Sequence, residues 1–290
     1  MKVAIVGGSG KMGQWFARLL AQEGNEVLLV GRSEEKLRTV QQELDVDITT
    51  DVGRVGDANA IILSVPLDSF EAVVKQIAPH THSGQSVVDF TSLKAEPVDI
   101  MHRHITSAVI LGTHPVFGPG AKSLVNQNFV LTPTNDGETA LADKVRDYLD
   151  ARGARVSLMA PEEHDRMMTV ILGLAHFIAI ASADTLLSME RFQEMKQIGG
   201  TTFRVLYTLM ESVISEDPEL YASLQMSFPD IGEIEGQFQQ SVKTWADLVK
   251  SGDRQAFVDR MSALKDRLEE TDPHFQKAYE DMYRITDGLP

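Results

Sequence analysis

A glycine-rich turn near the start of the chain constrains the fold most. Gly8, Gly10 and Gly13 have the spacing G-x-G-x-x-G, between a β-branched apolar run at residues 3–6 and a helical pattern at residues 11–23. A strand, such a turn and a helix, in this order, are typical of a dinucleotide-binding unit with the pyrophosphate at the helix N-terminus. In this interpretation Gly8 permits the tight turn, Gly10 admits the pyrophosphate and Gly13 allows close helix packing. The candidate cofactor-binding residues here are Gly8, Ser9, Gly10, Lys11, Met12 and Gly13.

The first half of the chain alternates short β-branched runs with helical stretches, which is typical of a parallel sheet with crossover helices. The predicted strands are residues 3–6, 26–30, 60–64, 86–90, 109–112 and 129–132. The predicted helices are residues 11–23, 34–43, 68–77 and 137–152. Several strands are apolar on both faces, as expected where helices cover both sides of a sheet. We predict an α/β fold, a Rossmann-type doubly wound parallel sheet, over residues 1–160.

The pattern changes after residues 155–158, and the rest of the chain is predicted to be helical. The predicted helices are residues 167–188, 192–214, 218–226, 231–251 and 253–270. We therefore predict an all-helical C-terminal domain over residues 161–290.

One apolar segment requires a membrane test. Residues 167–183 contain no charged side chain and have the minimum length of a spanning helix. Gly173, His176 and Ser182 within it, and charged residues on both sides, favour a buried core helix. We expect residues 167–188 to be central and buried in the helical domain.

Composition excludes some classes of partner and chemistry. The chain has 42 acidic and 27 basic side chains, a net charge of −15, which argues against a nucleic-acid partner. It has no cysteine, so disulfides, zinc–thiolate sites and a thiol nucleophile are excluded. The N-terminus enters the first strand directly, without the apolar stretch of a secretory signal. We expect a cytoplasmic protein without a membrane partner.

The end of the second predicted strand bears on cofactor choice. NAD-specific proteins usually place an acidic residue there to bind the ribose 2′-hydroxyl, whereas this chain has Arg32 and Ser33. Arg32 could pair with a 2′-phosphate, so we predict NADP, with NAD as the alternative cofactor. The competing interpretation is that Arg32 is a solvated cation and that Ser33 caps the next helix.

A third cofactor segment follows the strand at residues 60–64. Ser64, Val65 and Pro66 lie at the carboxyl edge of the predicted sheet, where ligands of open α/β sheets bind. They could border the nicotinamide ribose, or they could form a plain strand-terminating turn.

Candidate catalytic groups lie in three polar segments, residues 89–94, 112–118 and 173–177. A dinucleotide enzyme needs a base that takes a hydroxyl proton as hydride leaves the same carbon, and histidine has the side-chain pKa closest to neutrality. His114, at a strand end and before a proline, is the best placed of the eight histidines. Ser92 could orient the same hydroxyl. His176, on an apolar helix, is either a core residue or a substrate residue.

The other histidines suggest structural roles. His80, His82, His102 and His104 form two H-x-H pairs without cysteine partners or an HExxH motif, so we predict surface histidines and no metal. His164 and Asp165 lie at a helix start, where we predict a capping role.

Several of these segments together resemble the prephenate dehydrogenase family, including its arogenate-using relatives. They are residues 6–13 (VGGSGKMG), 89–94 (DFTSLK), 114–118 (HPVFG), 163–165 (EHD) and 174–176 (LAH). The resemblance covers nearly the whole chain. It implies an oxidative decarboxylation in which His114 is the base, Ser92 orients the hydroxyl and His176 belongs to the substrate site. It also implies that the helical domain mediates dimerisation.

The chain departs from the family pattern at two places. Family members often have Leu-Pro-His where this chain has Leu-Ala-His at residues 174–176, and they carry a substrate-carboxylate arginine shortly after a Gly-x-Phe stretch. Arg204 is the nearest substitute for that arginine, because a guanidinium can hold a carboxylate with two hydrogen bonds. Arg204 could equally be a helix-surface cation.

The predicted function is that of an NAD(P)-dependent prephenate dehydrogenase of tyrosine biosynthesis. It would convert prephenate, or arogenate, to 4-hydroxyphenylpyruvate, or tyrosine, as a homodimer. One alternative is another NADP-dependent two-domain oxidoreductase, related to β-hydroxyacid dehydrogenases or to deazaflavin-linked NADP reductases. The other is a non-catalytic nucleotide-sensing protein. A β-hydroxyacid dehydrogenase is expected to carry a catalytic lysine on its helical domain, where residues 173–177 offer a histidine.

Overall fold

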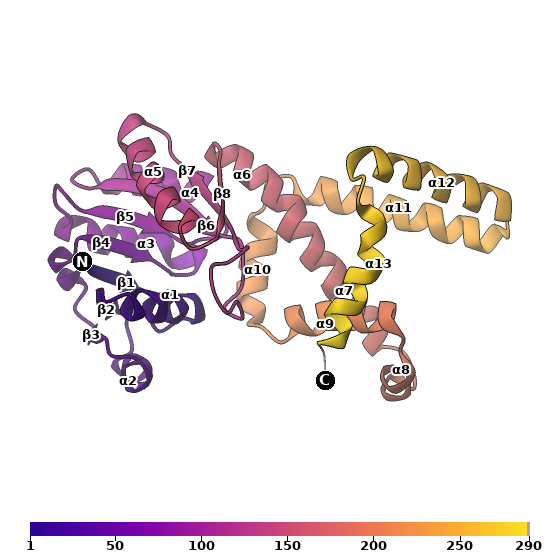
Figure 1. Ribbon diagram of the computed structural model, residues 1–290, viewed down its shortest axis with the longest axis horizontal. Helices are drawn as coiled ribbons and strands as arrows, with labels where there is room; N and C mark the ends of the chain where they lie inside the picture. Colours follow the sequence, from indigo (N-terminus) through magenta and orange to yellow (C-terminus); the bar gives the residue numbers. More distant parts are fainter. Residues whose placement is uncertain (289–290) are drawn as a thin grey trace. The chain divides into compact units, whose positions relative to one another are not determined.

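The computed structural model describes residues 1–288, which form two compact units, Met1–Met168 and a second unit from Thr169 onward. The first unit alternates strands and helices along the chain (Figure 1). Its elements are β1 (Lys2–Val6), α1 (Lys11–Gln22), β2 (Glu26–Val30), α2 (Glu34–Glu43), β3 (Asp47–Thr49), η1 (Val52–Asp57), β4 (Ala60–Leu63), α3 (Leu67–Ile77), η2 (Ala78–His80), β5 (Ser86–Asp89), α4 (Ala95–His104), β6 (Val109–Pro115), β7 (Asn128–Thr132), α5 (Asp136–Asp150), β8 (Arg155–Leu158) and α6 (Pro161–Met168).

These strands form one eight-stranded sheet in the order β3-β2-β1-β4-β5-β6-β7-β8. The strands from β3 to β6 are mutually parallel, with β1 between β2 and β4, so the chain winds outward in both directions from β1. The predicted doubly wound α/β fold is confirmed. The carboxyl ends of β1, β4, β5 and β6 consequently meet at one edge of the sheet.

One strand pairing departs from the parallel sheet. β7 runs antiparallel to β6, and β8 is parallel to β7. The physical reason is the connection: residues 116–127 join β6 to β7 without a helix, whereas a parallel neighbour normally requires a helical crossover.

Both faces of the sheet are buried, by different helices. Val3 and Ile5 of β1 pack with α1 and α2 on one face. Ala4 and Val6 of the same strand pack with α3 and α4 on the other. This alternation explains why β1 is apolar at every central position, since each residue faces a helix layer.

The second unit is helical, as predicted. Its elements are the π-helical segment η3 (Thr169–Leu174), α7 (Ala175–Leu187), α8 (Phe192–Ile198), α9 (Thr201–Ile214), α10 (Pro218–Ser227), α11 (Ile231–Ser251), α12 (Arg254–Thr271), η4 (Phe275–Lys277) and α13 (Ala278–Asp287). Helix α9 packs against α7 and α13, and α11 packs against α12 and η3. The single helix predicted at residues 192–214 is two helices, because Gly199 lets the chain pass Phe203 too closely for a Cβ.

The expectation that residues 167–188 are buried is wrong for a single chain. Within the described part of the chain, the continuous helical stretch Pro161–Leu187 is apolar and long enough to cross a membrane by length and composition alone. Only 17% of its most apolar window is buried. Val170, Ile171 and Leu187 are each about half exposed or more. The helices that pack on α7 within its own unit cover too little of its circumference to bury it.

Candidate active site

The glycine-rich turn follows β1 at the carboxyl edge of the sheet. Gly10 is the N-cap of α1 and provides no side-chain cap, so the backbone N–H groups of the first helical turn lack a side-chain acceptor there. A Cβ on Gly13 would lie 2.7 Å from the Gly7 carbonyl oxygen, so the helix approaches the turn more closely than an alanine would allow. Ser9 accepts a hydrogen bond from Gln14 on its carbonyl oxygen, at 2.8 Å, which holds the turn against the helix. This geometry suits a bound pyrophosphate.

The tight turn is made by Gly7, and the assignment of that role to Gly8 is wrong. Gly7 has φ of 84°, and a Cβ there would lie 2.1 Å from the carbonyl oxygen of Ser64. Gly8 is glycine for another reason, because its Cβ would collide with the side chain of Leu29 at 2.8 Å. The sequence feature that could have indicated this role is the pair of adjacent glycines, Gly7 and Gly8, whose first member lies one residue before the motif.

The end of β2 places Arg32 at the surface and Ser33 at the start of α2. Ser33 accepts a hydrogen bond from the Lys36 backbone N–H at 3.3 Å, so it caps the helix as the competing interpretation states. The Glu34 carboxylate pairs with Arg38 at 2.6 Å, one helical turn onward. Glu34 is therefore partly neutralised by a residue other than Arg32.

The segment after β4 is bound to the glycine turn. The Ser64 backbone N–H donates to the Val6 carbonyl oxygen at 2.8 Å, and the Ser64 carbonyl oxygen faces Gly7. Val65 packs against the core, and Pro66 is the N-cap of α3. These residues lie at the same carboxyl edge as the glycine turn, as predicted.

His114 lies near the end of β6, buried within a chain of polar side chains. Its Nδ1 atom lies 2.8 Å from Nε2 of His164 on α6. The Nδ1 atom of His164 lies 2.7 Å from Oδ1 of Asp165. The Asp165 carboxylate also accepts hydrogen bonds from the backbone N–H groups of Lys94, at 2.7 Å, and Ala95, at 2.9 Å, at the start of α4. The sheet unit thus carries an Asp–His–His chain of hydrogen-bonded side chains, which is anchored on the N-terminus of α4.

A buried ion pair supports this chain. The Lys94 ammonium donates to Asp89 at the end of β5, to the Thr113 carbonyl oxygen at 2.7 Å and to the Thr91 hydroxyl at 3.2 Å. Both charged side chains are fully buried. Burial lowers the pKa of Lys94, and the carboxylates of Asp89 and Asp165 oppose that shift. Three acceptors satisfy the three ammonium donors, so the pair fixes the end of β5 beside that of β6.

Burial is also the main reason that the pKa of His114 lies well below its ordinary value, and the nearby His164 and Lys94 lower it further. A proton on either neighbour repels a second positive charge on His114. The ring is therefore neutral near pH 7, the state in which imidazole can accept a proton.

The structure overturns the predicted capping role of His164 and Asp165. His164 is fully buried, and Asp165 stabilises the N-terminus of α4, a helix distant in sequence from its own. Helix α4 lies outside the predicted helices, so its start could not have suggested this role. The available signal was the EHD segment itself, whose three titratable residues precede an apolar helix.

Ser92 lies in the loop after β5, half-buried. This loop and His114 are at adjacent strand ends, since β5 pairs with β6. Among residues 1–288 no hydrogen bond of the Ser92 hydroxyl is observed. A hydroxyl in that position is available to a ligand.

His176 lies in the helical unit, on α7, directly after the π-helical segment. Its ring packs edge-on against Tyr221 of α10, with ring centres 4.9 Å apart. Its Nδ1 atom and the Oε1 atom of Gln225 are buried without a hydrogen-bond partner in the described chain. Burial lowers the pKa of His176. Unpaired buried polar atoms are costly, and π-helical segments are frequent at functional sites, so both features favour a ligand role over a purely structural one.

Arg204 has a structural partner. One of its guanidinium nitrogens donates to the Thr286 carbonyl oxygen of α13 at 3.1 Å. That contact stabilises the end of the last described helix, where carbonyl groups lack helical donors.

The H-x-H histidines are engaged in local contacts. His102 lies 2.5 Å from the buried carboxylate of Glu138, and His104 lies 3.4 Å from Glu71. His82 contacts the carbonyl oxygens of Ser83 and Gly56. His102 is exposed, as predicted, whereas His104 is partly buried. The described residues contain no group of three or more His, Asp or Glu side chains suited to a metal ion.

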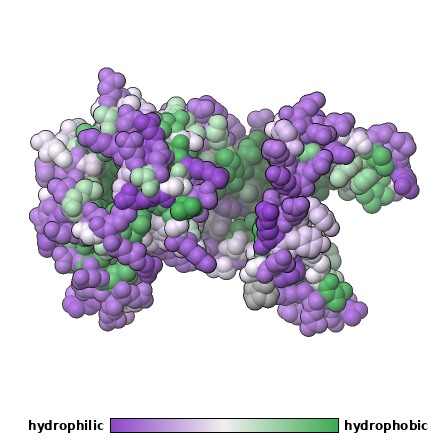
Figure 2. Space-filling view, in the orientation of Figure 1, coloured by the Kyte–Doolittle hydropathy of each residue, from purple (hydrophilic) through white to green (hydrophobic). Residues whose placement is uncertain are grey.

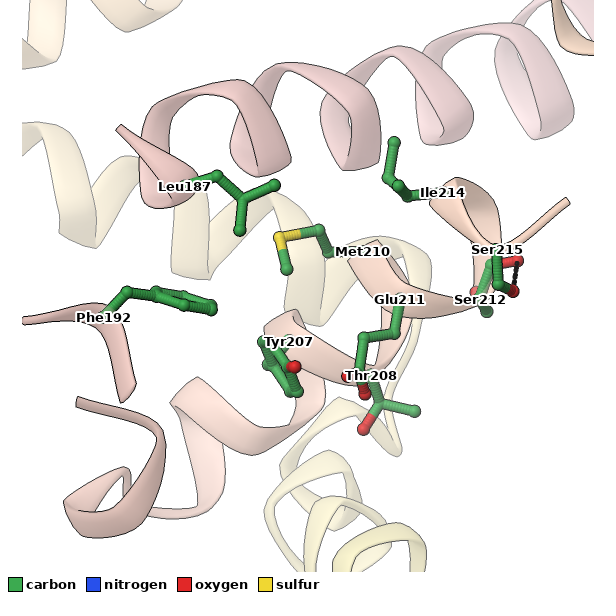
Figure 3. Close-up of a pocket in the computed structure, with 9 residues that line it drawn as sticks. All are labelled: Leu187, Phe192, Tyr207, Thr208, Met210, Glu211, Ser212, Ile214 and Ser215. Carbon is green, nitrogen blue, oxygen red and sulfur yellow. Dashed lines mark hydrogen bonds between the residues drawn. The ribbon is translucent and has the colours of Figure 1, made fainter. Parts of the chain in front are cut away.

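An open groove in the helical unit contains none of the predicted site residues. Figure 3 shows Leu187 and Phe192 facing Tyr207 and Met210 across it, with Glu211 at the side. It is mainly apolar and lies between α7, α8 and α9. We assign no cofactor or substrate to it.

Two domain models of one family match the chain in order. The prephenate dehydrogenase nucleotide-binding domain matches residues 16–158, and the prephenate dehydrogenase dimerization domain matches residues 160–263. The first match begins after the glycine turn, so the assignment of that turn rests on its own geometry.

Named relatives agree with these models. A probable arogenate/prephenate dehydrogenase of Methanocaldococcus jannaschii is 35% identical over 267 residues, which cover 90% of this chain and 59% of the relative. A T-protein of Haemophilus influenzae is 25% identical over 277 residues, covering 95% of this chain and 69% of that protein. The chain therefore spans about three-fifths of the first relative and two-thirds of the second.

Solved structures confirm the fold. The prephenate dehydrogenase of A. aeolicus in complex with hydroxyphenyl propionate and NAD+ has a TM-score of 0.76 and 22% identity, covering 94% of this chain and 98% of that one. Synechocystis arogenate dehydrogenase has a TM-score of 0.70 and 18% identity, covering 94% of this chain and all of the other. With both domain models matched in sequence order across residues 16–263, this chain belongs to the prephenate dehydrogenase family.

Proposed function

We propose that the protein catalyses the NAD(P)-dependent oxidative decarboxylation of prephenate, or of arogenate, to 4-hydroxyphenylpyruvate, or tyrosine. The observation that carries this proposal, besides the family, is a neutral buried histidine with an ordered hydrogen-bond partner. It lies at the same sheet edge as a turn shaped for a pyrophosphate. A proton acceptor and a hydride acceptor at one edge are what the oxidation of an alcohol requires.

The reaction removes a proton, a hydride and a carboxylate from the substrate, and each needs an acceptor or an exit. His114 accepts the proton of the ring hydroxyl. Loss of this proton lets the oxygen form a double bond to its carbon, and this expels the hydride from the same carbon. The nicotinamide of bound NAD(P)+ supplies the hydride acceptor. The bond between the ring carbon and the carboxylate breaks, and carbon dioxide leaves. The electron pair of that bond completes the aromatic ring, and the phenolate oxygen takes a proton back, which restores neutral His114. His114 must be deprotonated before substrate binds, and the depressed pKa of its ring ensures this near neutral pH.

Three further residues are proposed to contact the substrate. Ser92 orients the substrate hydroxyl toward His114, which its free hydroxyl and its place beside β6 support. His176 contributes a substrate contact, which its unpaired buried nitrogen supports. Arg204 is the candidate partner for a substrate carboxylate, and in that role it would exchange its contact with Thr286 for the ligand.

The experiment is a spectrophotometric assay of the purified full chain. Each of NAD+ and NADP+ is supplied with prephenate and, separately, with arogenate, and the formation of reduced nicotinamide is followed. We expect turnover with at least one substrate and a rate strongly reduced in His114→Asn. Cofactor binding without turnover on either compound would favour a nucleotide sensor. Oxidation of β-hydroxyacids alone would favour the other oxidoreductase class.

NADP is the proposed preferred cofactor. No acidic residue occupies the end of β2, where Arg32 is exposed and can reach a 2′-phosphate. The pairing of Glu34 with Arg38 supports this preference, because it reduces the repulsion that a free Glu34 carboxylate would exert on the phosphate.

The helical unit is the proposed surface of a homodimer. Helix α12 carries an exposed apolar stripe at Phe257, Met261, Leu264 and Leu268, spaced so that all four lie on one face. In Figure 2 apolar side chains reach the surface of this unit among hydrophilic ones. A second copy of the chain is the occupant that the matched dimerization domain indicates.

Light scattering tests the dimer. We expect the native chain to have the mass of a dimer at micromolar concentration, and Leu264→Asp to dissociate it, because a charge in an apolar interface is left unpaired. Ser262→Asp places the same charge away from the stripe and should leave the dimer intact. A stable native monomer would contradict the proposal.

A further inference from the structure

Three polar contacts connect the N-terminus of α4 to the proposed base. The first is the Asp165 carboxylate on the backbone N–H groups of Lys94 and Ala95. The second joins Asp165 to Nδ1 of His164, and the third joins Nε2 of His164 to Nδ1 of His114. His164 is fully buried and His114 nearly so. Water therefore has little access to these contacts, and the proton of each hydrogen bond comes from one of the protein atoms that the bond joins.

The donors determine where those protons lie. Asp165 faces two backbone N–H groups that can only donate, so its carboxylate must act as an acceptor. Nδ1 of His164 accordingly donates to Asp165, which leaves Nε2 of a neutral His164 as an acceptor. The proton between the two histidines then belongs to Nδ1 of His114. Nε2 of His114 retains its lone pair and is the nitrogen available to substrate.

We propose that His164 and Asp165 are positioning residues for the base: they hold His114 in the tautomer whose Nε2 can accept the substrate hydroxyl proton, and they stabilise the imidazolium that results. This inference rests on the proposed function and deepens it. It assigns roles to two residues outside the catalytic and binding residues named above.

The proton step balances within this chain. The hydroxyl proton forms a bond to Nε2 of His114, and the imidazolium keeps its Nδ1–H on Nε2 of His164. The negative charge of Asp165 compensates the new positive charge through His164. The other ionisable groups beside these residues are Lys94 at the start of α4 and Asp89 at the end of β5, and they neutralise each other. Without the relay, a buried imidazolium would have no hydrogen-bond acceptor for its second N–H.

The first test reads the tautomer directly and does not depend on turnover. Nitrogen NMR of the full chain labelled with ¹⁵N-histidine, at mildly alkaline pH, distinguishes rings protonated on Nδ1 from rings protonated on Nε2. Signals are assigned with His114→Asn and His164→Gln, and the exposed His274 serves as reference. We expect Nδ1–H on both His114 and His164. A proton on Nε2 of His114 would overturn the proposal, whereas a failed assay on prephenate and arogenate would leave this result standing.

The second test compares pH profiles of variants. His164→Phe removes the acceptor, so we expect kcat to fall by about 10–10²-fold, as for loss of a group that orients a functional imidazole. The acid limb should also move to lower pH, because a neutral His164 exerts no charge repulsion and its loss removes the acceptor for Nδ1–H of the His114 imidazolium. His164→Gln offers an amide oxygen as acceptor and should restore part of kcat. His274→Gln is the matched control and should match the native profile.

Asp165→Asn keeps the shape of the side chain but removes its charge. It keeps the proposal testable if His164→Phe fails to fold. Its acid limb should move in the same direction with an unchanged KM for the nicotinamide cofactor. A kcat for His164→Phe equal to that of the control would overturn the proposal. So would a lower plateau with an unmoved acid limb in both His164→Phe and Asp165→Asn, since that is the signature of a merely structural role.

Discussion

The two units of this chain bury their apolar side chains to different extents. The sheet unit covers both faces of its strands, so that Ile5, Leu29 and Phe70 are completely buried. The helical unit buries few large apolar side chains and exposes many, including Met226 at 84% and Val249 at 68%. A sheet with helices on both faces completes its own core, whereas long helices present apolar stripes that need another surface.

This difference separates the proposed tasks of the two units. The self-contained unit holds the nucleotide turn and the buried Asp–His–His chain, whose geometry depends on rigid strand ends. The incomplete unit holds the surface proposed for a second copy. Matched substitutions in the sheet unit and in the helical unit test this division of tasks.

The largest expected effect concerns chemistry in the sheet unit. His114→Asn should lower kcat by about 10²–10⁴-fold and leave cofactor affinity intact, because it removes general-base assistance. The matched change in the helical unit, His176→Asn, should act mainly on KM for the substrate. Steady-state kinetics and cofactor titration measure both. A kcat for His114→Asn equal to the native value would remove that residue from the mechanism.

The next effect concerns stability. Phe70→Ala empties a completely buried position and should lower the free energy of unfolding by about 3–5 kcal/mol. Leu264→Ala removes a large apolar side chain from the exposed stripe of α12, so in dilute protein it should cost about 1 kcal/mol or less. Urea unfolding at two protein concentrations measures this difference. If the two variants were equally destabilised at low concentration, the contrast between the units would be wrong.

Cofactor selection should depend on the end of β2. Arg32→Ala should lower kcat/KM with NADP by about 10–150-fold and spare NAD, since a charge-assisted contact to the 2′-phosphate is worth about 1.5–3 kcal/mol. Arg54→Ala, another exposed arginine of the sheet unit, is the control. Equal losses with both cofactors would mean that Arg32 only stacks on adenine. A native preference for NAD would refute the NADP proposal.

The smallest effect is the acid sensitivity of the sheet unit. The pKa of His114 is lower in the folded than in the unfolded protein, so below about pH 6.5 the unfolded state binds more protons. Stability should therefore fall as the pH is lowered from that value, by at most about 1.4 kcal/mol per pH unit for this group. Thermal melting from neutral to mildly acidic pH should show the decrease, and His114→Asn should reduce it. An identical slope in that variant would assign the acid sensitivity to other groups.

Much of the local structure followed from the sequence. The predicted strand at residues 26–30 and helix at residues 34–43 coincide with β2 and α2. Elements outside the predictions have weak local patterns. β3 is three residues long with a single apolar side chain, and α4 contains a proline and charged last-turn residues. Helix α13 is as long as the predicted α2, so length does not explain its omission. The direction of β7 depends on its connection, which strand periodicity does not encode.

The candidate site was predictable only in part. His114 could be selected because a strand end before a proline is a local feature. Its partner His164 lies 50 positions away, and a helix-start pattern favoured capping for that residue. Burial of residues 167–188 was predicted from composition, which cannot state whether the cover comes from the same chain.

The sequence by itself determined the features that depend on near neighbours: the glycine-rich turn, the alternation of strands and helices, and the absence of an acid after β2. A turn or a period requires only residues within a few positions of each other. The tertiary structure decided which distant polar groups share a site and which apolar faces remain uncovered. Those outcomes depend on strand order and helix packing, which bring β6 and α6 together and leave α12 with an exposed stripe.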